Sequence, residues 1–242
     1  MTRFLASVRD VAEADLALAA CADILDLKDP GKGALGAVDR HTIRLCVAHI
    51  AGRAPVSATV GDLAMDASIV PGAVAATASC GVDDVKLGIM PGGDPEACFA
   101  GLREIHMSAG LILVFFADAM PAIDPVQAAR AAGARGVMLD TAGKGEGALL
   151  DHMALRDVAR FVADGRRAGL MVGVAGSLAP KHVALLLALR PDVMGFRGAL
   201  CREGLRDRGL DAVACGRIRA LIPVSPQRPG AQMREPHAAA LC

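Results

Sequence analysis

Short apolar segments alternate with longer segments of helical pattern along most of the 242-residue chain. The apolar segments have the length and composition of buried strands, and the longer segments repeat apolar residues at helical spacing. We predict strands at residues 4–8, 23–28, 56–60, 85–89, 111–117, 136–140, 170–175 and 193–197. We predict helices at residues 11–20, 38–51, 70–80, 95–109, 125–132, 155–168, 180–189 and 211–221. The chain therefore consists of eight successive βα units.

A regular alternation of strands and helices is typical of an α/β protein with a parallel sheet. Eight such units with short connections predict a single (β/α)8 barrel, or TIM barrel. An open Rossmann-type sheet is the alternative, but the first βα turn has no G-x-G-x-x-G motif. We predict that residues 1–222 form the barrel as one catalytic domain. The proline-rich, polar residues 223–242 are predicted to form a loose tail.

The composition excludes several classes of partner. Lysine and arginine together number 26, and so do aspartate and glutamate, so no net field attracts nucleic acid or an anionic membrane. The chain has no tryptophan, no tyrosine and only six phenylalanines, which leaves no aromatic platform for single-stranded nucleic acid. We expect neither a nucleic-acid partner nor a membrane partner.

The cysteines and histidines show no pattern of a metal site or a disulfide framework. The seven cysteines include no C-x-x-C pair, and the six histidines lack metal-ligand spacing. Scattered free thiols suit a reducing compartment. We recognise neither a signal peptide nor an apolar stretch of membrane-spanning length. We expect a cytoplasmic protein that requires no metal and no cofactor.

Charged residues end several of the predicted strands. Asp26 and Lys28 are two residues apart at the end of the second strand, so their side chains share a face. Lys86 lies in the fourth strand, Asp140 ends the sixth, and Lys144 is on the loop that follows. Two more charged residues stand at the ends of the fifth and eighth strands, Asp118 and Arg197. Because the carboxyl ends of barrel strands meet at one mouth, we predict that these side chains share an active site.

Lysines beside aspartates in a barrel mouth favour Schiff-base chemistry. Mutual repulsion and partial burial lower the pKa of a lysine, which makes a neutral amine available to attack a carbonyl carbon. The neighbouring carboxylates can then move protons. The structural alternative is a network of ion pairs that closes the open end of the barrel.

Two glycine-bearing turns follow the seventh and eighth strands, where barrels commonly bind phosphate through backbone N–H groups. The predicted phosphate-binding residues are Gly176, Ser177, Arg197 and Gly198. Tight turns with no ligand are the alternative interpretation. Residues 57–62, which are small and polar, end the third strand. They either line the pocket or close a turn.

Six motifs in order over residues 4–222 resemble the (5-formylfuran-3-yl)methyl phosphate synthase family. They lie at residues 23–37, 57–62, 85–88, 138–144, 175–178 and 197–201. The resemblance implies a (β/α)8 barrel that joins two molecules of glyceraldehyde 3-phosphate, with loss of phosphate and water, to form the furan precursor of methanofuran cofactors. Such an enzyme is a carbon–oxygen lyase acting on phosphates.

The resemblance also implies roles for single residues. Lys28 would be the Schiff-base lysine with Asp26 beside it, and Lys86, Asp140 and Lys144 would serve proton transfer and carbanion or phosphate handling. The chain departs from the family pattern in its glycine-rich segment 143–147 and in segment 202–209, both of which bear on phosphate contacts.

Two other functions remain open from the sequence. A class I aldolase on a phosphorylated sugar would share the imine lysine but release no phosphate. A non-catalytic, phosphate-binding barrel would use the lysines only to hold anions. For the synthase we expect a triose phosphate as the small-molecule partner, and a homo-oligomer as the assembly.

Overall fold

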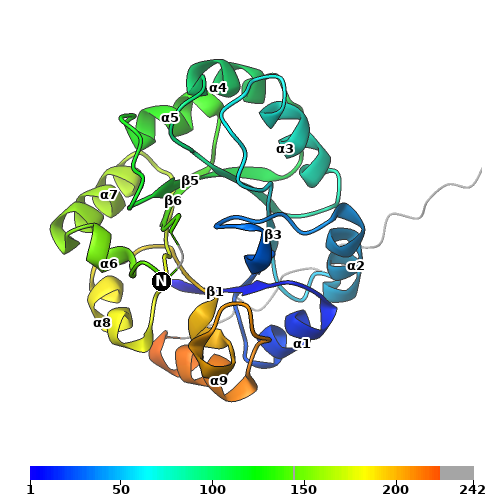
Figure 1. Cartoon of the computed structure of the whole chain (residues 1–242), viewed down its shortest axis with the longest axis vertical. Coiled ribbons are helices and arrows are strands. Elements are labelled where there is room, and N and C mark those ends of the chain that lie inside the picture. Colours follow the sequence, from blue (N-terminus) through cyan, green and yellow to red (C-terminus); the bar gives the residue numbers. More distant parts are fainter. Residues whose placement is uncertain (144, 224–242) are drawn as a thin grey trace, which may run out of the picture.

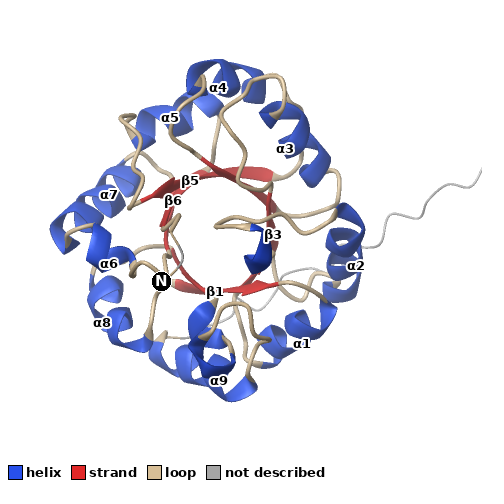
Figure 2. Cartoon of the chain, viewed as in Figure 1, coloured by secondary structure: helices blue, strands red, loops and turns tan. Residues whose placement is uncertain are grey.

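The computed structural model describes residues 1–143 and 145–223. In this part of the chain eight parallel strands form a closed barrel, and each strand is hydrogen-bonded to the next in sequence order, with β8 returning to β1. The helices form an outer ring around the strands (Figures 1 and 2). The predicted (β/α)8 barrel is confirmed. Lys144 and the predicted tail from residue 224 onward lie outside the described residues.

The strands begin and end close to their predicted positions. Their bounds are β1 (Arg3–Val8), β2 (Ile24–Leu27), β3 (Val56–Thr59), β4 (Asp84–Gly88), β5 (Gly110–Phe116), β6 (Gly136–Asp140), β7 (Met171–Val174) and β8 (Val193–Phe196). Lys28 is the first residue after β2, and its N–H still donates to the carbonyl of Val8 at 3.0 Å.

The described helices include all eight that the sequence predicts. The α-helices are α1 (Val11–Ala19), α2 (Arg40–Ile50), α3 (Val70–Ala78), α4 (Pro95–Arg103), α5 (Pro125–Ala132), α6 (Leu149–His152), α7 (Leu155–Arg167), α8 (Pro180–Ala188) and α9 (Ala212–Leu221). Three short 3-10 turns are η1 (Pro30–Lys32), η2 (Gly198–Leu200) and η3 (Arg202–Gly204). The four-residue helix α6 was not predicted, because so short a segment shows no periodicity.

Helix α4 is shorter than the predicted 95–109. It ends at Arg103, and the N–H group of Ile105 turns back to the carbonyl of Leu102 at 3.3 Å. The following residues lead the chain to Gly110, which opens β5 in register with Asp84 of β4. The barrel register therefore sets where this helix must stop.

Aspartates begin several of the helices by the same contact. The carboxylate accepts the backbone N–H three residues later, which satisfies a donor that has no partner inside the helix. The capping residues of α1, α2, α4, α5 and α9 are Asp10, Asp39, Asp94, Asp124 and Asp211. These caps fix where each helix begins after its loop.

The inside of the barrel has a polar part and an apolar part. Polar and charged side chains enter it from β1 to β4 and β6, whereas the apolar part is a buried cluster from the later strands and the loop after β2. That cluster comprises Ala34, Leu35, Ile112, Val114, Phe116, Met138 and Ala175. The loop after β2, with turn η1, projects into the ring in the view of Figure 1 and closes the apolar part.

Two carboxylates fasten loops at this mouth. Asp62 accepts the N–H groups of Ala34 and Leu35 at 2.7 and 2.8 Å, which holds the loop after β2. Asp118 accepts those of Ala142 and Gly143 at 2.7 and 2.6 Å, which holds the start of the loop after β6. Asp118 was predicted to face the active site, and the structure instead shows it clamping a neighbouring loop.

No helix in the described residues is long and apolar enough to cross a membrane.

Candidate active site

Three neighbouring strands place polar side chains side by side inside the barrel. Ser7 of β1, Asp26 of β2 and Ser57 of β3 are direct partners in the strand register. The Ser57 hydroxyl donates to Asp26 Oδ1 at 2.6 Å, and the Ser7 hydroxyl donates to Asp26 Oδ2 at 3.2 Å. Each oxygen of this buried carboxylate therefore has a hydroxyl partner, which fixes its orientation.

Two lysine–aspartate pairs lie inside the barrel. Lys86 Nζ lies 3.0 Å from Asp26 Oδ1, and Lys28 Nζ lies 3.5 Å from Asp140 Oδ2. All four side chains are buried, with relative exposures of 1% for Asp26, 7% for Lys28, 4% for Lys86 and 4% for Asp140. The structure thus brings together four of the five catalytic residues that the sequence predicts, and the fifth, Lys144, lies outside the described residues.

The two lysines differ in how tightly they are held. Lys86 contacts a carboxylate that two serines orient, whereas the contact of Lys28 with Asp140 is longer, at 3.5 Å. Burial alone raises the pKa of Asp26, but attraction to Lys86 and Lys28 and hydrogen bonds from Ser57 and Lys86 outweigh it. The pKa of Asp26 is therefore held below the ordinary aspartate value, and the residue acts as a fixed anion.

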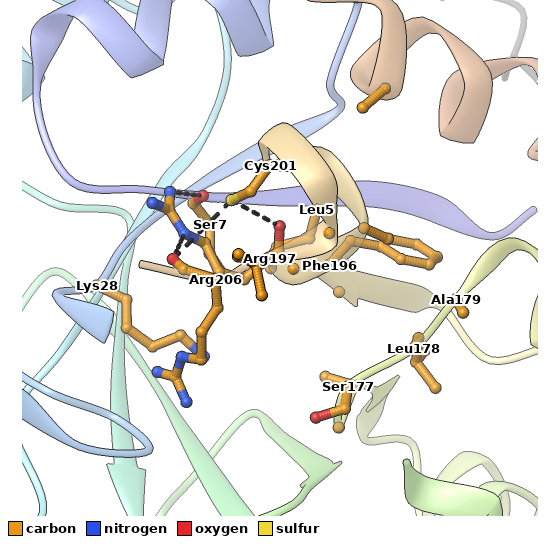
Figure 3. A pocket seen from close by; sticks show the side chains of 18 of the residues that line it. Leu5, Ser7, Lys28, Ser177, Leu178, Ala179, Phe196, Arg197, Cys201 and Arg206 are labelled. Carbon is orange, nitrogen blue, oxygen red and sulfur yellow. Dashed lines mark hydrogen bonds between the residues drawn. The ribbon is translucent and has the colours of Figure 1, made fainter. Parts of the chain in front are cut away.

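A cavity of about 910 Å³ opens from these pairs toward the loops after β7 and β8. Its inner wall includes Lys28, Lys86 and Asp140, and its outer wall includes Gly176, Ser177 and Gly198. Figure 3 shows Lys28, Ser177 and Arg206 around this space. The volume suits a small-molecule ligand rather than a polymer. No group of three or more histidine, cysteine or acidic side chains among the described residues could hold a metal ion.

The loop after β7 is shaped for close contact with its neighbour. Gly176 has φ +99°, and a Cβ there would lie 3.0 Å from the Thr141 side chain and 3.1 Å from the Thr141 backbone nitrogen. Ser177 follows with φ +48°, a left-handed value that is uncommon for serine. Strained backbone at a cavity wall is typical of a functional loop.

We expect Gly176→Ala to destabilise the protein by about 2–3 kcal/mol, because it adds backbone strain and a clash with the chain beside Asp140. The control is Gly169→Ala, where φ is +76° but nothing lies within 4 Å of the added carbon. Urea unfolding should show a clearly larger loss for Gly176→Ala than for the control. Equal losses would show that the contact with the β6 loop is unimportant.

Arg197 does not have the arrangement of a phosphate ligand. All five of its N–H donors are used inside the protein. Two go to the Glu13 carboxylate, and the others go to the carbonyls of Ser7, Arg206 and Arg208 at 3.1, 2.9 and 3.1 Å. The predicted phosphate role of Arg197 therefore needs correction: its guanidinium ties the loop after β8 to the first βα unit.

Glu13 is the partner that the sequence did not reveal. It is 4% exposed in the first helix, 184 residues from Arg197. Burial raises the pKa of Glu13, but the hydrogen bonds and charge of Arg197, helped by Arg9, outweigh it and hold the pKa below the ordinary glutamate value. The only sequence signal was a glutamate on an otherwise alanine-rich helix face.

We expect Arg197→Gln to cost about 3–5 kcal/mol at neutral pH, because it leaves the Glu13 carboxylate buried and unpaired. In the wild type, Glu13 contributes stability that is present above its unfolded pKa of about 4.3 and is lost as the pH falls toward its lower folded pKa. In the variant the pKa of Glu13 rises. The difference in free energy of unfolding between the wild type and the variant should therefore become smaller as the pH falls. Urea unfolding from pH 7 to 4 measures this. A stable variant with a raised KM would restore the phosphate role.

A family model described as 4-HFC-P synthase matches residues 4–219. A Methylorubrum extorquens protein, provisionally named a (5-formylfuran-3-yl)methyl phosphate synthase, is 42% identical over 86% of each chain. The (5-formylfuran-3-yl)methyl phosphate synthase of Methanopyrus kandleri is 33% identical over 86% of this chain and 92% of its own. The chain belongs to the 4-HFC-P synthase family. The resemblance found in the motifs is confirmed, and the chain is an enzyme.

Solved structures agree on the fold. Phosphoribosyl anthranilate isomerase from Thermus thermophilus superposes with a TM-score of 0.63 at 17% identity, covering 91% of this chain and 98% of that one. The 3-hexulose-6-phosphate synthase of Salmonella typhimurium also gives 0.63, at 14% identity and the same coverage. At such low identity these structures support the barrel architecture alone.

Proposed function

We propose that the enzyme condenses two molecules of glyceraldehyde 3-phosphate into (5-formylfuran-3-yl)methyl phosphate, through an imine on Lys28. One phosphate and two waters leave, which balances the atoms of two trioses against one furan phosphate. The product would serve as a precursor of a methanofuran-type cofactor. The observation that carries the proposal is the pair of buried lysine–aspartate contacts at one end of a cavity, in a chain of the 4-HFC-P synthase family.

Lys28 is the better nucleophile of the two lysines on geometric grounds. Lys28 lines the cavity, as Lys86 does, but its carboxylate partner is farther away, with Asp140 Oδ2 at 3.5 Å. The neutral amine then adds to the aldehyde carbon of one triose, and the aldehyde oxygen leaves as water to give the imine. Lys86 is engaged by the oriented carboxylate of Asp26 at 3.0 Å, so it serves as a fixed positive charge beside the reacting carbons.

Asp140 is placed to move the next proton. Once the imine forms, the carbon beside it becomes acidic, and a base near Lys28 can remove its proton to give an enamine. Asp140 Oδ2 is the carboxylate oxygen in contact with Lys28 Nζ. The electron pair of the enamine can expel the phosphate from the adjacent carbon. Bond formation to the second triose, ring closure, dehydration and hydrolysis of the imine then complete the furan and release Lys28.

The phosphate groups would lie toward the loops after β7 and β8. Gly176, Ser177 and Gly198 line that end of the cavity. Within the described residues their backbone N–H groups donate to no other group, which leaves them available to an anion. Three of the four predicted phosphate residues therefore remain in the proposal, without Arg197.

The test is to incubate the enzyme with glyceraldehyde 3-phosphate and to follow free phosphate together with near-ultraviolet absorbance. The chain has neither tryptophan nor tyrosine, so the furan aldehyde can be observed with little protein background. We expect one phosphate released for each furan formed. A class I aldolase would consume the triose without releasing phosphate, and a binding protein would leave it unchanged. Either result would contradict the proposal.

A further inference from the structure

A short loop between η2 and α9 covers the outer end of the cavity. It comprises residues 202–209, and a bridge between Cys201 and Leu210 closes its base. Arg197 holds the loop by donating to the carbonyls of Arg206 and Arg208 at 2.9 and 3.1 Å. The side chain of Arg206 leaves this fixed backbone and points into the cavity, toward the region of Lys28 (Figure 3).

In contrast to Arg197, Arg206 leaves most of its N–H donors unused within the described residues. Within the described residues its guanidinium makes one hydrogen bond, from Nη2 to the carbonyl of Gly33 at 2.9 Å. Its Nε is buried and has no partner. A buried N–H without an acceptor costs free energy, so such a group is uncommon unless a ligand or water fills the place. The two arginines therefore divide two tasks, since Arg197 builds the loop and Arg206 presents free donors.

The electrostatic surroundings of Arg206 also favour an anion. Burial lowers the pKa of Arg206 from its ordinary value, and the charge of Arg197 acts in the same direction, although Asp140 and Asp62 oppose both. The guanidinium has lost water and is only partly compensated by acids. An anion that restored this lost solvation would bind favourably. The interaction with Asp140, the partner of Lys28, shows that Arg206 lies within electrostatic reach of the proposed imine site.

We propose that Arg206 binds the phosphate group of the triose whose aldehyde reacts with Lys28. This inference rests on the proposed function for the identity of the ligand. The planar guanidinium can hold a phosphate monoester with its Nε–H and one N–H of Nη2, while the other N–H of Nη2 keeps its contact with Gly33. Together with the N–H groups of Gly176 and Ser177, it would fix the substrate at one end and leave the aldehyde directed inward.

The experiment compares the wild type with Arg206→Gln and Arg206→Lys, and uses Arg208→Gln as the control. Arg208 is an exposed residue of the same loop, and its side chain does not line the cavity. Binding of inorganic phosphate is measured by calorimetry, and KM is measured with glyceraldehyde 3-phosphate. Arg206→Gln should weaken phosphate binding and raise KM, each by about 30-fold or more. Arg206→Lys should change both quantities by less, because lysine keeps the charge but not the planar pair of donors. Arg208→Gln should match the wild type.

Unphosphorylated glyceraldehyde separates this inference from the proposed function. Borohydride trapping of its imine needs Lys28 but no phosphate, so the yield should be the same in the wild type and in Arg206→Gln. Phosphate binding that is absent from the wild type, or within twofold of it in Arg206→Gln, would overturn the inference. If phosphate binding depends on Arg206 but no aldehyde forms an imine, the phosphate site stands and the proposed function is contradicted.

Discussion

Lys28→Arg is expected to abolish both imine formation and furan synthesis. Arginine keeps the positive charge near Asp140, but a guanidinium does not supply the neutral amine that adds to a carbonyl. Turnover of glyceraldehyde 3-phosphate should fall to the uncatalysed background, and the variant should remain folded. The measurement is furan absorbance and phosphate release, with thermal melting to check the fold.

The matched control is Lys32→Arg. Lys32 lies four residues farther along the chain, and its side chain is 59% exposed and pairs with Asp29 at 3.2 Å outside the main cavity. It should retain wild-type turnover. Substantial turnover in Lys28→Arg would assign the nucleophile to another residue, of which Lys86 is the nearest candidate.

Asp140→Asn is expected to separate imine formation from the later proton transfers. Asparagine keeps the shape and can still accept the N–H of Thr141, which lies 2.8 Å from Oδ1 in the wild type. It cannot act as a base, so furan production should fall by about 10²–10⁴, the usual contribution of one general acid–base group. Glyceraldehyde 3-phosphate should still form a borohydride adduct on Lys28.

A surface change tests whether this effect is specific. Asp157→Asn alters a 40% exposed side chain on α7 that pairs with the neighbouring Arg156 at 3.6 Å. It should leave turnover unchanged. If Asp140→Asn unfolds the protein, or leaves turnover intact, Asp140 belongs to a structural ion pair and Asp26 becomes the candidate for proton transfer.

Much of the barrel could be predicted because buried parallel strands and amphipathic helices leave separate patterns in the sequence. The charges at Asp26, Lys86 and Asp140 interrupt apolar strands, and a barrel brings strand ends to one mouth. Their meeting in space thus follows from local pattern and topology together. The length of α4 did not follow, since it depends on the register between β4 and β5.

The two arginines show where sequence reasoning stops. Arg197 has the position of a phosphate ligand, but its donors are taken by Glu13, which is 184 residues distant, and by loop carbonyls. No local pattern reports such a partner. Arg206 lies in an irregular loop, so the direction of its side chain depends on how Arg197 holds the backbone around it.

The most direct measurement of the central claim is to trap the wild type with borohydride in the presence of glyceraldehyde 3-phosphate, and then to map the modified peptide by mass spectrometry. We predict a single reduced adduct on Lys28, formed at a rate that matches furan production. Furan production without an adduct, or an adduct confined to Lys86, would contradict the assignment of Lys28 as the imine-forming residue.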